Sequence, residues 1–556
     1  MEILLPASVV GVAMLAGAWQ TPGATVRSVN PVAGNEACAS CHAEIYKTYS
    51  QTVMARASGP AIEGVITGEF THPTSGVHYK VYKQDGHVWM SYARAKEVGF
   101  RGQRELLYFI GSGVKGRTYL YSVDGFLFEA PINWYSQEGK WNMTPAYMDA
   151  RESPMNLPAY PSCLNCHASG MQAPEAGTDS KFAGEPFAHG GITCERCHGA
   201  GTAHSDGKGA IVNPAKLEPE RRDAICMECH FEGTVAVEQP GKHLYDFQPG
   251  ERLSDDVHYF LQSTNDPEKP QAVSQFEALS QSECKRQSGD KMWCGSCHDP
   301  HSEPSASERA SYYRGKCLSC HGQGEQGEAF AAKHHANKPD CTACHMPQLP
   351  SKDVAHVETT DHRIRKNPEA PPPPRLEVRG FVGAPLLAFP ESDEKLATTR
   401  DFALGFETLA LRGVPDMAKR AESYLRKAVE AKQDDPATLA ALGFVEQLRK
   451  NDDEARELYE RALKIDPLDN EAATNLGMIE ARAGNLRSAV ELWQGAFARA
   501  PERSVIGMNL AMAFCAANQK DDAKRYVERV LEFNPDYGKA KSLLANLGKE
   551  PVQCKP

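Results

Sequence analysis

The pattern Cys-x-x-Cys-His occurs seven times in this chain of 556 residues, and no other feature constrains the fold as strongly. In each copy, two thiols three positions apart can form thioether bonds to the two vinyl groups of one porphyrin. The adjacent histidine then lies under the iron as its proximal ligand. Zinc ribbons and thioredoxin-type dithiols also use Cys-x-x-Cys, but neither requires a histidine after every second cysteine. The pattern therefore predicts seven covalently bound c-type haems.

We number the copies motifs 1 to 7 in chain order. Of 17 cysteines, three lie outside the motifs. Cys515 is expected in a buried helical core and Cys554 in a frayed tail, while Cys284 is a weak candidate for approach to an iron. The predicted thioether residues are Cys38, Cys41, Cys163, Cys166, Cys194, Cys197, Cys226, Cys229, Cys294, Cys297, Cys317, Cys320, Cys341 and Cys344. The predicted proximal ligands are His42, His167, His198, His230, His298, His321 and His345.

Histidines outside the motifs can supply the distal ligand of each iron. The chain has 19 histidines, which leaves twelve after the proximal ligands are assigned. His301 follows His298 by three residues and cannot reach the far side of its own haem, so we expect it to ligate a neighbouring haem. His204, which lies six residues after His198, suits the same cross-ligation. Such sharing would bring neighbouring haems into close contact.

For the haem of motif 1 the sequence leaves two distal ligands open. Met54 could return over its other face, where a thioether raises the potential, although a methionine on a helix is more commonly a core residue. His72 is the rival candidate. His78 and His87 lie in a hairpin pattern and are expected to be exposed or packing residues. The full set of distal candidates is Met54, His72, His204, His258, His301, His334, His335, His356 and His362.

Charge and the first residues of the chain bear on location and partners. The net charge of −11 argues against a nucleic-acid partner. Haem attachment to cysteine thiols implies maturation outside the cytoplasm, so we predict a periplasmic or otherwise extracytoplasmic protein. The short apolar run over residues 3–18 predicts a signal peptide over residues 1–24, since it is too short for a confident membrane span. A basic start is missing, so an uncleaved anchor remains the alternative and membrane association stays open.

Between a haem-1 segment (residues 30–60) and motif 2, residues 61–150 predict a small β-rich insertion. Alternating aromatic and β-branched residues flank Asp85-Gly86 and Asp124-Gly125, which are strong hairpin signals. Residues 151–368 hold the other six motifs and predict a loop-rich domain in which porphyrins supply the apolar core, because such a segment would otherwise bury too little to fold. The prolines at 371–374 predict a stiff linker over residues 369–392.

From residue 393 to 550 the composition changes to Ala, Leu, Glu, Lys and Arg, with a period of 34 residues. Pro467, Pro501 and Pro535 recur at this interval, and Gly443 and Gly477 keep the same register. This pattern resembles the tetratricopeptide repeat, in which small residues let paired helices approach closely. It predicts three repeats over residues 435–534, a degenerate earlier one around residues 421–428 and a capping helix over residues 536–548.

The fold class expected is therefore mixed: a loop-rich multihaem cytochrome c domain with a small β-rich insertion, followed by an all-α tetratricopeptide repeat solenoid. The segments around His204, His301 and His345 make the chain resemble the bacterial multihaem cytochrome c superfamily, in particular members with C-terminal tetratricopeptide repeats. The resemblance implies bis-histidine haems in stacked and T-shaped pairs. It also implies that the histidine six residues past a motif is a distal ligand. The Cys-x-x-Cys-Lys site of the superfamily's nitrite reductases is absent.

Three functions remain open at the level of sequence. The favoured one is electron transfer by a heptahaem cytochrome whose helical repeats dock a redox partner, because the available distal ligands outnumber the haems and superhelical repeats suit protein binding. The alternative is an oxidoreductase acting on a small nitrogen or sulfur compound at one open haem. In the third, the repeats form a scaffold and the haems are ancillary. The chain is thus expected to be an electron carrier rather than an enzyme.

Overall fold

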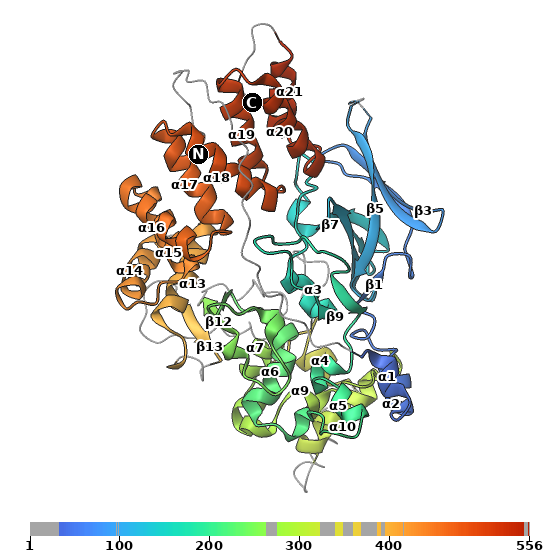
Figure 1. The fold of residues 1–556 in the computed structure, drawn as a ribbon. Coiled ribbons are helices and arrows are strands. Elements are labelled where there is room, and N and C mark those ends of the chain that lie inside the picture. The colour runs from blue at the N-terminus through green and yellow to red at the C-terminus, as the bar shows by residue number, and fades with distance from the viewer. Residues whose placement is uncertain are drawn as a thin grey trace.

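The computed structural model describes residues 33–95, 97, 99–262, 275–322, 340–348, 360–367, 386–390, 395–414, 416–549 and 554. Figure 1 shows three regions: a β-sheet, a cluster of short helices and loops, and an arc of paired helices. The predicted signal peptide lies outside the described residues. Among the described residues, no helix combines the length and apolarity needed to cross a membrane.

The β-rich region predicted from the hairpin signals is confirmed as an eight-stranded antiparallel sheet. Asp85 and Gly86, and likewise Asp124 and Gly125, have positive φ angles, as the tight hairpin turns between their strands require. The strand order is β2-β3-β4-β5-β6-β7-β8, with β1 paired to β5. The strands are β1 (Ser58–Pro60), β2 (Gly68–Thr71), β3 (Val77–Gln84), β4 (His87–Arg94), β5 (Arg101–Ile110), β6 (Gly116–Val123), β7 (Phe126–Tyr135) and β8 (Lys140–Met143).

The motif-bearing region consists of short helices joined by loops. Its helices are α1 (Asn35–Ala39), α2 (Ala43–Tyr49), α3 (Pro161–His167), α4 (Glu195–His198), α5 (Thr202–Ser205), α6 (Pro219–His230), α7 (Gln275–Ser280), α8 (Glu283–Ser288), α9 (Cys294–Cys297), α10 (Arg309–His321) and α12 (Thr342–His345). Although α10 spans 13 residues, neither it nor α9 or α12 has a buried side chain. These helices therefore pack on too little protein to be stable by themselves.

Two small sheets complete this region. Strands β9 (Ala168–Met171), which directly follows motif 2 in the chain, and β10 (Phe187–Gly190) form a two-stranded sheet. A three-stranded sheet consists of β11 (Val235–Glu238), β12 (Val257–Gln262) and β13 (Leu386–Phe389). Strand β13 belongs to the stretch predicted as an extended linker. Its residues pair instead with β12, from Leu386 opposite Gln262 to Phe389 opposite Tyr259. A four-residue strand whose partner lies more than a hundred residues away leaves no periodicity to detect, which explains the difference.

The C-terminal region is all-helical, as the 34-residue period predicts. Its helices are α13 (Thr399–Leu411), α14 (Met417–Glu430), α15 (Pro436–Leu448), α16 (Asp452–Ile465), α17 (Asn470–Arg482), α18 (Leu486–Arg499), α19 (Ser504–Ala516), α20 (Lys520–Phe533) and α21 (Gly538–Leu547). A Cβ at Gly443 would lie 2.8 Å from the ring of Tyr459, and one at Gly477 would lie 2.5 Å from Trp493. These glycines therefore let the aromatic ring of the second helix reach the first.

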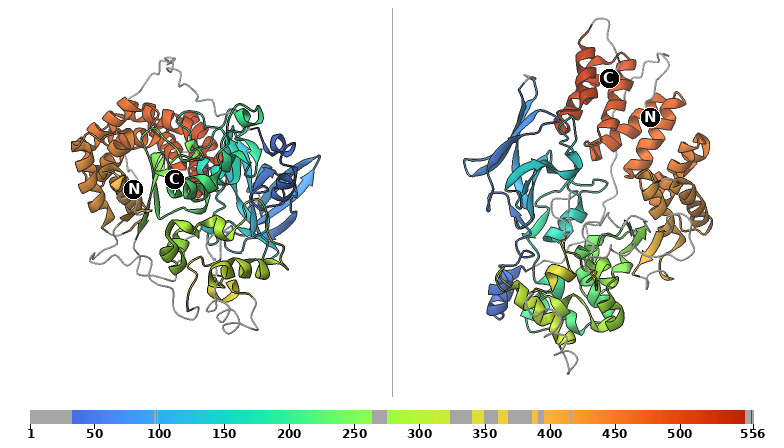
Figure 2. Two further views of the ribbon diagram at one scale, coloured as in Figure 1. Left: turned by 90° about the horizontal axis from the view of Figure 1, so that it is seen from below. Right: turned by 180° about the vertical axis from the view of Figure 1, so that it is seen from behind.

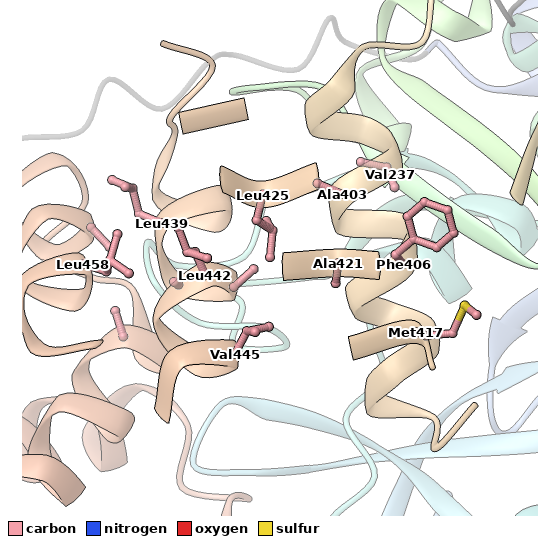
Figure 3. Packing of buried hydrophobic residues seen from close by; sticks show 14 of the residues in the cluster. Val237, Ala403, Phe406, Met417, Ala421, Leu425, Leu439, Leu442, Val445 and Leu458 are labelled. Atoms are coloured by element: carbon pink, nitrogen blue, oxygen red, sulfur yellow. The ribbon is translucent and has the colours of Figure 1, made fainter. Parts of the chain in front are cut away.

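The earliest repeat is more complete than the sequence suggested. Helices α13 and α14 pack as a pair, and their core continues into the small sheet through Val237 of β11 and Phe406 of α13. Figure 3 shows this unbroken apolar row from Val237 through Ala421 and Leu425 to Leu458 of α16. The repeats are thus joined to the motif-bearing region by a shared core.

The other end of the arc packs on the large sheet. Phe533 of α20 lies 5.8 Å, ring centre to ring centre, from both Phe126 and Phe128 of β7, and it belongs to the core of the sheet. Figure 2 shows α13 beside the small sheet and α20 and α21 beside the large one. The helical arc therefore contacts the preceding regions at both of its ends.

Candidate functional site

Each described motif folds as about one helical turn that presents its two cysteines and its histidine together. In motif 1 the backbone N–H of His42 donates to the carbonyl of Cys38 at 2.9 Å, and His198 of motif 3 does the same to Cys194 at 3.0 Å. Residues three and four positions apart share one face of a helix. Both cysteines and the histidine can therefore address a single porphyrin, as the spacing predicts.

The imidazole opposite His42 is that of His204. Their ring centroids are 6.4 Å apart and their planes differ by 18°. A metal bound at about 2 Å from the nitrogen of each of two imidazoles would lie ~3.2 Å from each ring centroid, so the two centroids would be ~6.4 Å apart. The pair thus has the separation of two axial ligands. Met54 and His72 are the ligands predicted for this position, whereas the residue that lies opposite His42 is His204.

A second pair joins motif 3 to motif 5. The ring centroids of His198 and His301 are 5.9 Å apart, with planes only 8° from parallel. His198 is oriented by a hydrogen bond from its Nδ1 to the carbonyl of Val212, at 2.8 Å. Metal-binding histidines commonly use one ring nitrogen in this way, which leaves the other directed at the metal. His301, three residues after motif 5, therefore faces the histidine of motif 3.

A third pair joins motif 5 to the segment that follows motif 7. The ring centroids of His298 and His362 are 6.2 Å apart, with an angle of 25° between their planes. Nδ1 of His362 is 3.0 Å from the carbonyl oxygen of Thr360, and Nδ1 of His298 is 3.2 Å from the Tyr313 hydroxyl. Each ring is thus held by a hydrogen bond at Nδ1.

Cysteine contacts connect the motifs further. The thiol of Cys166 is hydrogen-bonded to Cys229, and this contact and burial hold its pKa well above the usual value. Burial, followed by the neighbouring Cys38, raises the pKa of the Cys194 thiol to about 12. The cysteine pairs in contact are Cys38 with Cys194, Cys166 with Cys229, Cys226 with Cys294, and Cys317 with Cys341. They join motif 1 to 3, 2 to 4, 4 to 5 and 6 to 7.

The remaining predicted ligands divide into those with other partners and those outside the described residues. His72 is buried in the sheet, with Nδ1 2.8 Å from the Ser75 hydroxyl and Nε2 2.9 Å from the Met148 carbonyl oxygen. Since both ring nitrogens are engaged, we do not assign it to an iron. Met54 is half-buried. The predicted ligands His334, His335 and His356 lie outside the described residues.

His258 joins the small sheet to the first repeat helix. Its Nδ1 lies 3.0 Å from a carboxylate oxygen of Asp401 in α13, and its Nε2 is buried without a hydrogen-bond partner among the described residues. Burial opposes ionisation of Asp401, but the hydrogen bonds from His258 and Thr398 prevail and lower its pKa to about 2. His258 therefore links the small sheet to the first helix of the repeats.

The two cysteines near the end of the chain and the two histidines of the large sheet have other surroundings. Cys515 and Cys554 form a disulfide, which was not predicted because a separation of 39 residues carries no recognisable pattern. Cys515 is buried, as expected, but Cys554 is anchored rather than frayed. His78 and His87 have exposed side chains on the sheet, one of the two surroundings expected for them.

The helical repeats hold the motif-bearing region through polar contacts as well. Asp536, only 1% exposed, accepts hydrogen bonds from Arg94 of the sheet, from Lys541 and from the backbone N–H of Ser153. Nδ2 of Asn470 donates to the Gly177 carbonyl at 2.7 Å. The segment that carries motif 2 thus lies against the repeats, a contact between residues hundreds of positions apart that no sequence pattern could indicate.

Comparisons with known families agree with two of these regions. Residues 135–199, which include motifs 2 and 3, match the family Cytochrome c554 and c-prime. Residues 480–547 match the Tetratricopeptide repeat family. The chain therefore combines a cytochrome c segment with tetratricopeptide repeats. A comparison with curated proteins finds no match.

Solved structures resemble a limited part of the chain. MamA of strain AMB-1 is 21% identical, covers 28% of this chain and 86% of its own, and gives a TM-score of 0.25. MamA of Desulfovibrio magneticus RS-1 is 16% identical over 27% of this chain and 84% of its own, with the same TM-score of 0.25. The pilF protein of Pseudomonas aeruginosa is 27% identical over 27% of this chain and 69% of its own, with a TM-score of 0.24.

Proposed function

We propose that this chain is a heptahaem c-type cytochrome that transfers electrons outside the cytoplasm. One observation carries the proposal. In three motifs, the proximal histidine faces a histidine from elsewhere in the chain at the separation of two axial ligands. An iron held between two such histidines would have no position left for a substrate, which suits an electron carrier rather than a catalyst.

The described residues fit haem at these positions. When bound, each haem would accept and release one electron, at a potential set by its axial ligands and surroundings. The carbonyl of Val212 and the hydroxyl of Tyr313 orient two of the proximal histidines. Because His204, His301 and His362 each come from a segment adjoining a different motif, they would hold neighbouring haems close together, which favours passage of electrons along the series.

The helical repeats are proposed to carry the docking surface for a redox partner. Superhelical repeats present extended surfaces suited to protein binding. Part of this surface is taken by the chain itself, since Asn156 donates to the Glu502 carbonyl at 2.9 Å and Asn470 donates to Gly177. A partner would therefore dock on the remaining surface of the repeats, which are already fixed relative to the motifs.

Location outside the cytoplasm is supported by two kinds of cysteine chemistry. Fourteen cysteines lie in motifs suited to covalent haem attachment. In addition, Cys515 and Cys554 form a disulfide, a bond that persists in oxidising compartments. We therefore propose a periplasmic or otherwise extracytoplasmic location.

The intact mass and the low-temperature electron paramagnetic resonance spectrum of the oxidised holoprotein test this function. We expect seven haem increments of mass and low-spin signals only. A substantial high-spin fraction would contradict the proposal and favour the alternative, an oxidoreductase acting at one open haem. In that case nitrite, hydroxylamine and tetrathionate should each be assayed for turnover.

A further inference from the structure

A cavity of about 530 Å³ lies between the segment preceding α3 and the helices α17 and α19. Its volume falls within the range of small-molecule sites, which form preferentially where two regions of a protein meet. The cytochrome segment supplies one wall and the repeats supply the other. The lining residues that matter are Asn156, Pro158 and Tyr160 on one side, and Glu502, Ser504 and Val505 on the other.

The walls of the cavity expose large apolar side chains. Tyr160 is 42% exposed and Val505 is 59% exposed, although both are large hydrophobic residues. Pro158 and Ile506 also line the cavity but are buried residues. Neighbouring exposed apolar groups rimmed by polar residues mark binding sites more often than they occur by chance. Tyr160 in particular offers the face of an aromatic ring, which favours an aromatic ligand.

The polar residues that line the cavity carry little net charge together. Burial raises the pKa of the Glu502 carboxyl to about 7, so it can donate or accept a hydrogen bond near neutral pH. Ser504 is only 7% exposed, and its hydroxyl has no hydrogen-bond partner among the described residues. Arg503 faces the carboxylate of Asp179 at 3.7 Å. An uncharged ligand with hydrogen-bonding oxygens suits this environment best.

The cavity adjoins motif 2. Tyr160 immediately precedes α3, and its carbonyl accepts a hydrogen bond from the backbone N–H of Cys163 at 3.0 Å. A ligand stacked on Tyr160 would therefore lie near Cys163, the predicted thioether cysteine three residues further along the chain. We propose that this cavity binds a small, neutral aromatic molecule carrying hydrogen-bonding oxygens, the chemistry of a quinone. Binding in the cavity does not depend on the proposed electron-transfer function.

Calorimetric titration of the full-length holoprotein with 1,4-naphthoquinone tests the site. We expect saturable binding with one site per chain. Tyr160→Ala should weaken it roughly tenfold by removing the stacking face. Val505→Arg should weaken it at least as much, because it puts a charge and a longer side chain into the apolar wall. The matched control is Leu448→Arg, since Leu448 is a 56% exposed residue at the end of α15 outside the cavity lining.

The control should bind naphthoquinone as the unaltered protein does. Circular dichroism of each variant checks that the repeats remain folded. Absence of saturable binding, or equal binding by the Val505→Arg and Leu448→Arg proteins, would overturn the proposal. Because the readout is heat of binding rather than haem reduction, its failure is distinguishable from failure of the electron-transfer function.

Discussion

The motif-bearing region and the helical repeats solve the same folding problem in different ways. In the repeats, small and large apolar residues pack into continuous cores that include Trp493 and Phe514. In the motif-bearing region, the 13-residue helix α10 has no buried side chain at all. A helix of this length is not stable in water without packing. The repeats are thus held by packed protein side chains, whereas α9, α10 and α12 lack such a core, which the proposed haems would supply.

The largest expected effect comes from producing the protein without haem. In protein produced without haem attachment, we expect α9 and α10 (residues 294–321) to lose all protection from hydrogen exchange, because neither helix has a buried side chain. Helices α15 to α20 should retain protection close to that of the holoprotein. Mass spectrometry of exchanged peptides measures both regions at once. Equal protection of α10 with and without haem would refute the comparison.

The contact between the repeats and the large sheet is tested by Asp536→Ala. This carboxylate is 1% exposed and accepts hydrogen bonds from Arg94, Lys541 and the Ser153 N–H, while both cations also pair with Glu97. Its removal therefore leaves the buried Ser153 N–H without its acceptor, and the loss of hydrogen bonds to a charged group costs roughly 1.5–3 kcal/mol of unfolding free energy. Asp453→Ala is the control, since this carboxylate is 99% exposed and its pair with Arg456 contributes about 0–1 kcal/mol. Denaturant titration of both variants gives the comparison, and similar losses would contradict it.

Asp536 also predicts a dependence on pH. Burial opposes its ionisation, but hydrogen bonds from Arg94, Lys541 and the Ser153 N–H prevail and lower its pKa in the folded protein. A group whose folded pKa is depressed stabilises the fold above its unfolded pKa of about 3.9 and loses that contribution as pH falls through the folded value. Unfolding free energy should therefore fall below about pH 4. Asp536→Asn should flatten this slope, and an unchanged slope would remove Asp536 as its cause.

The smallest effect concerns close packing inside the repeats. Gly477→Ala puts a Cβ 2.5 Å from the Trp493 ring, and such overpacking costs about 1–3 kcal/mol. Gly495→Ala is the matched control, because its Cβ would lie 3.3 Å from the end of the flexible Arg499 side chain. That substitution should be neutral or stabilise α18 by up to about 1 kcal/mol through helix propensity. Thermal unfolding distinguishes the two, and equal melting temperatures would argue against tight packing at Gly477.

Local signals predicted more of this molecule than long-range ones. The Asp-Gly hairpins and the helices of the repeats follow from residues adjacent in sequence or in register, and both are present. Strand β13 and the disulfide between Cys515 and Cys554 depend on partners that spacing alone does not identify. The placement of His204 opposite His42 was missed for the same reason, since the sequence showed that His204 serves a neighbour without showing which one.

The most direct test of the account is the spin state of the irons after single distal histidines are removed. In His204→Ala, His301→Ala and His362→Ala, each variant should convert one haem in seven to high spin, measured by low-temperature electron paramagnetic resonance of the oxidised holoprotein. His87→Ala, an exposed histidine on the sheet, should leave the spectrum unchanged. A spectrum that stays entirely low-spin in all three variants would contradict the account.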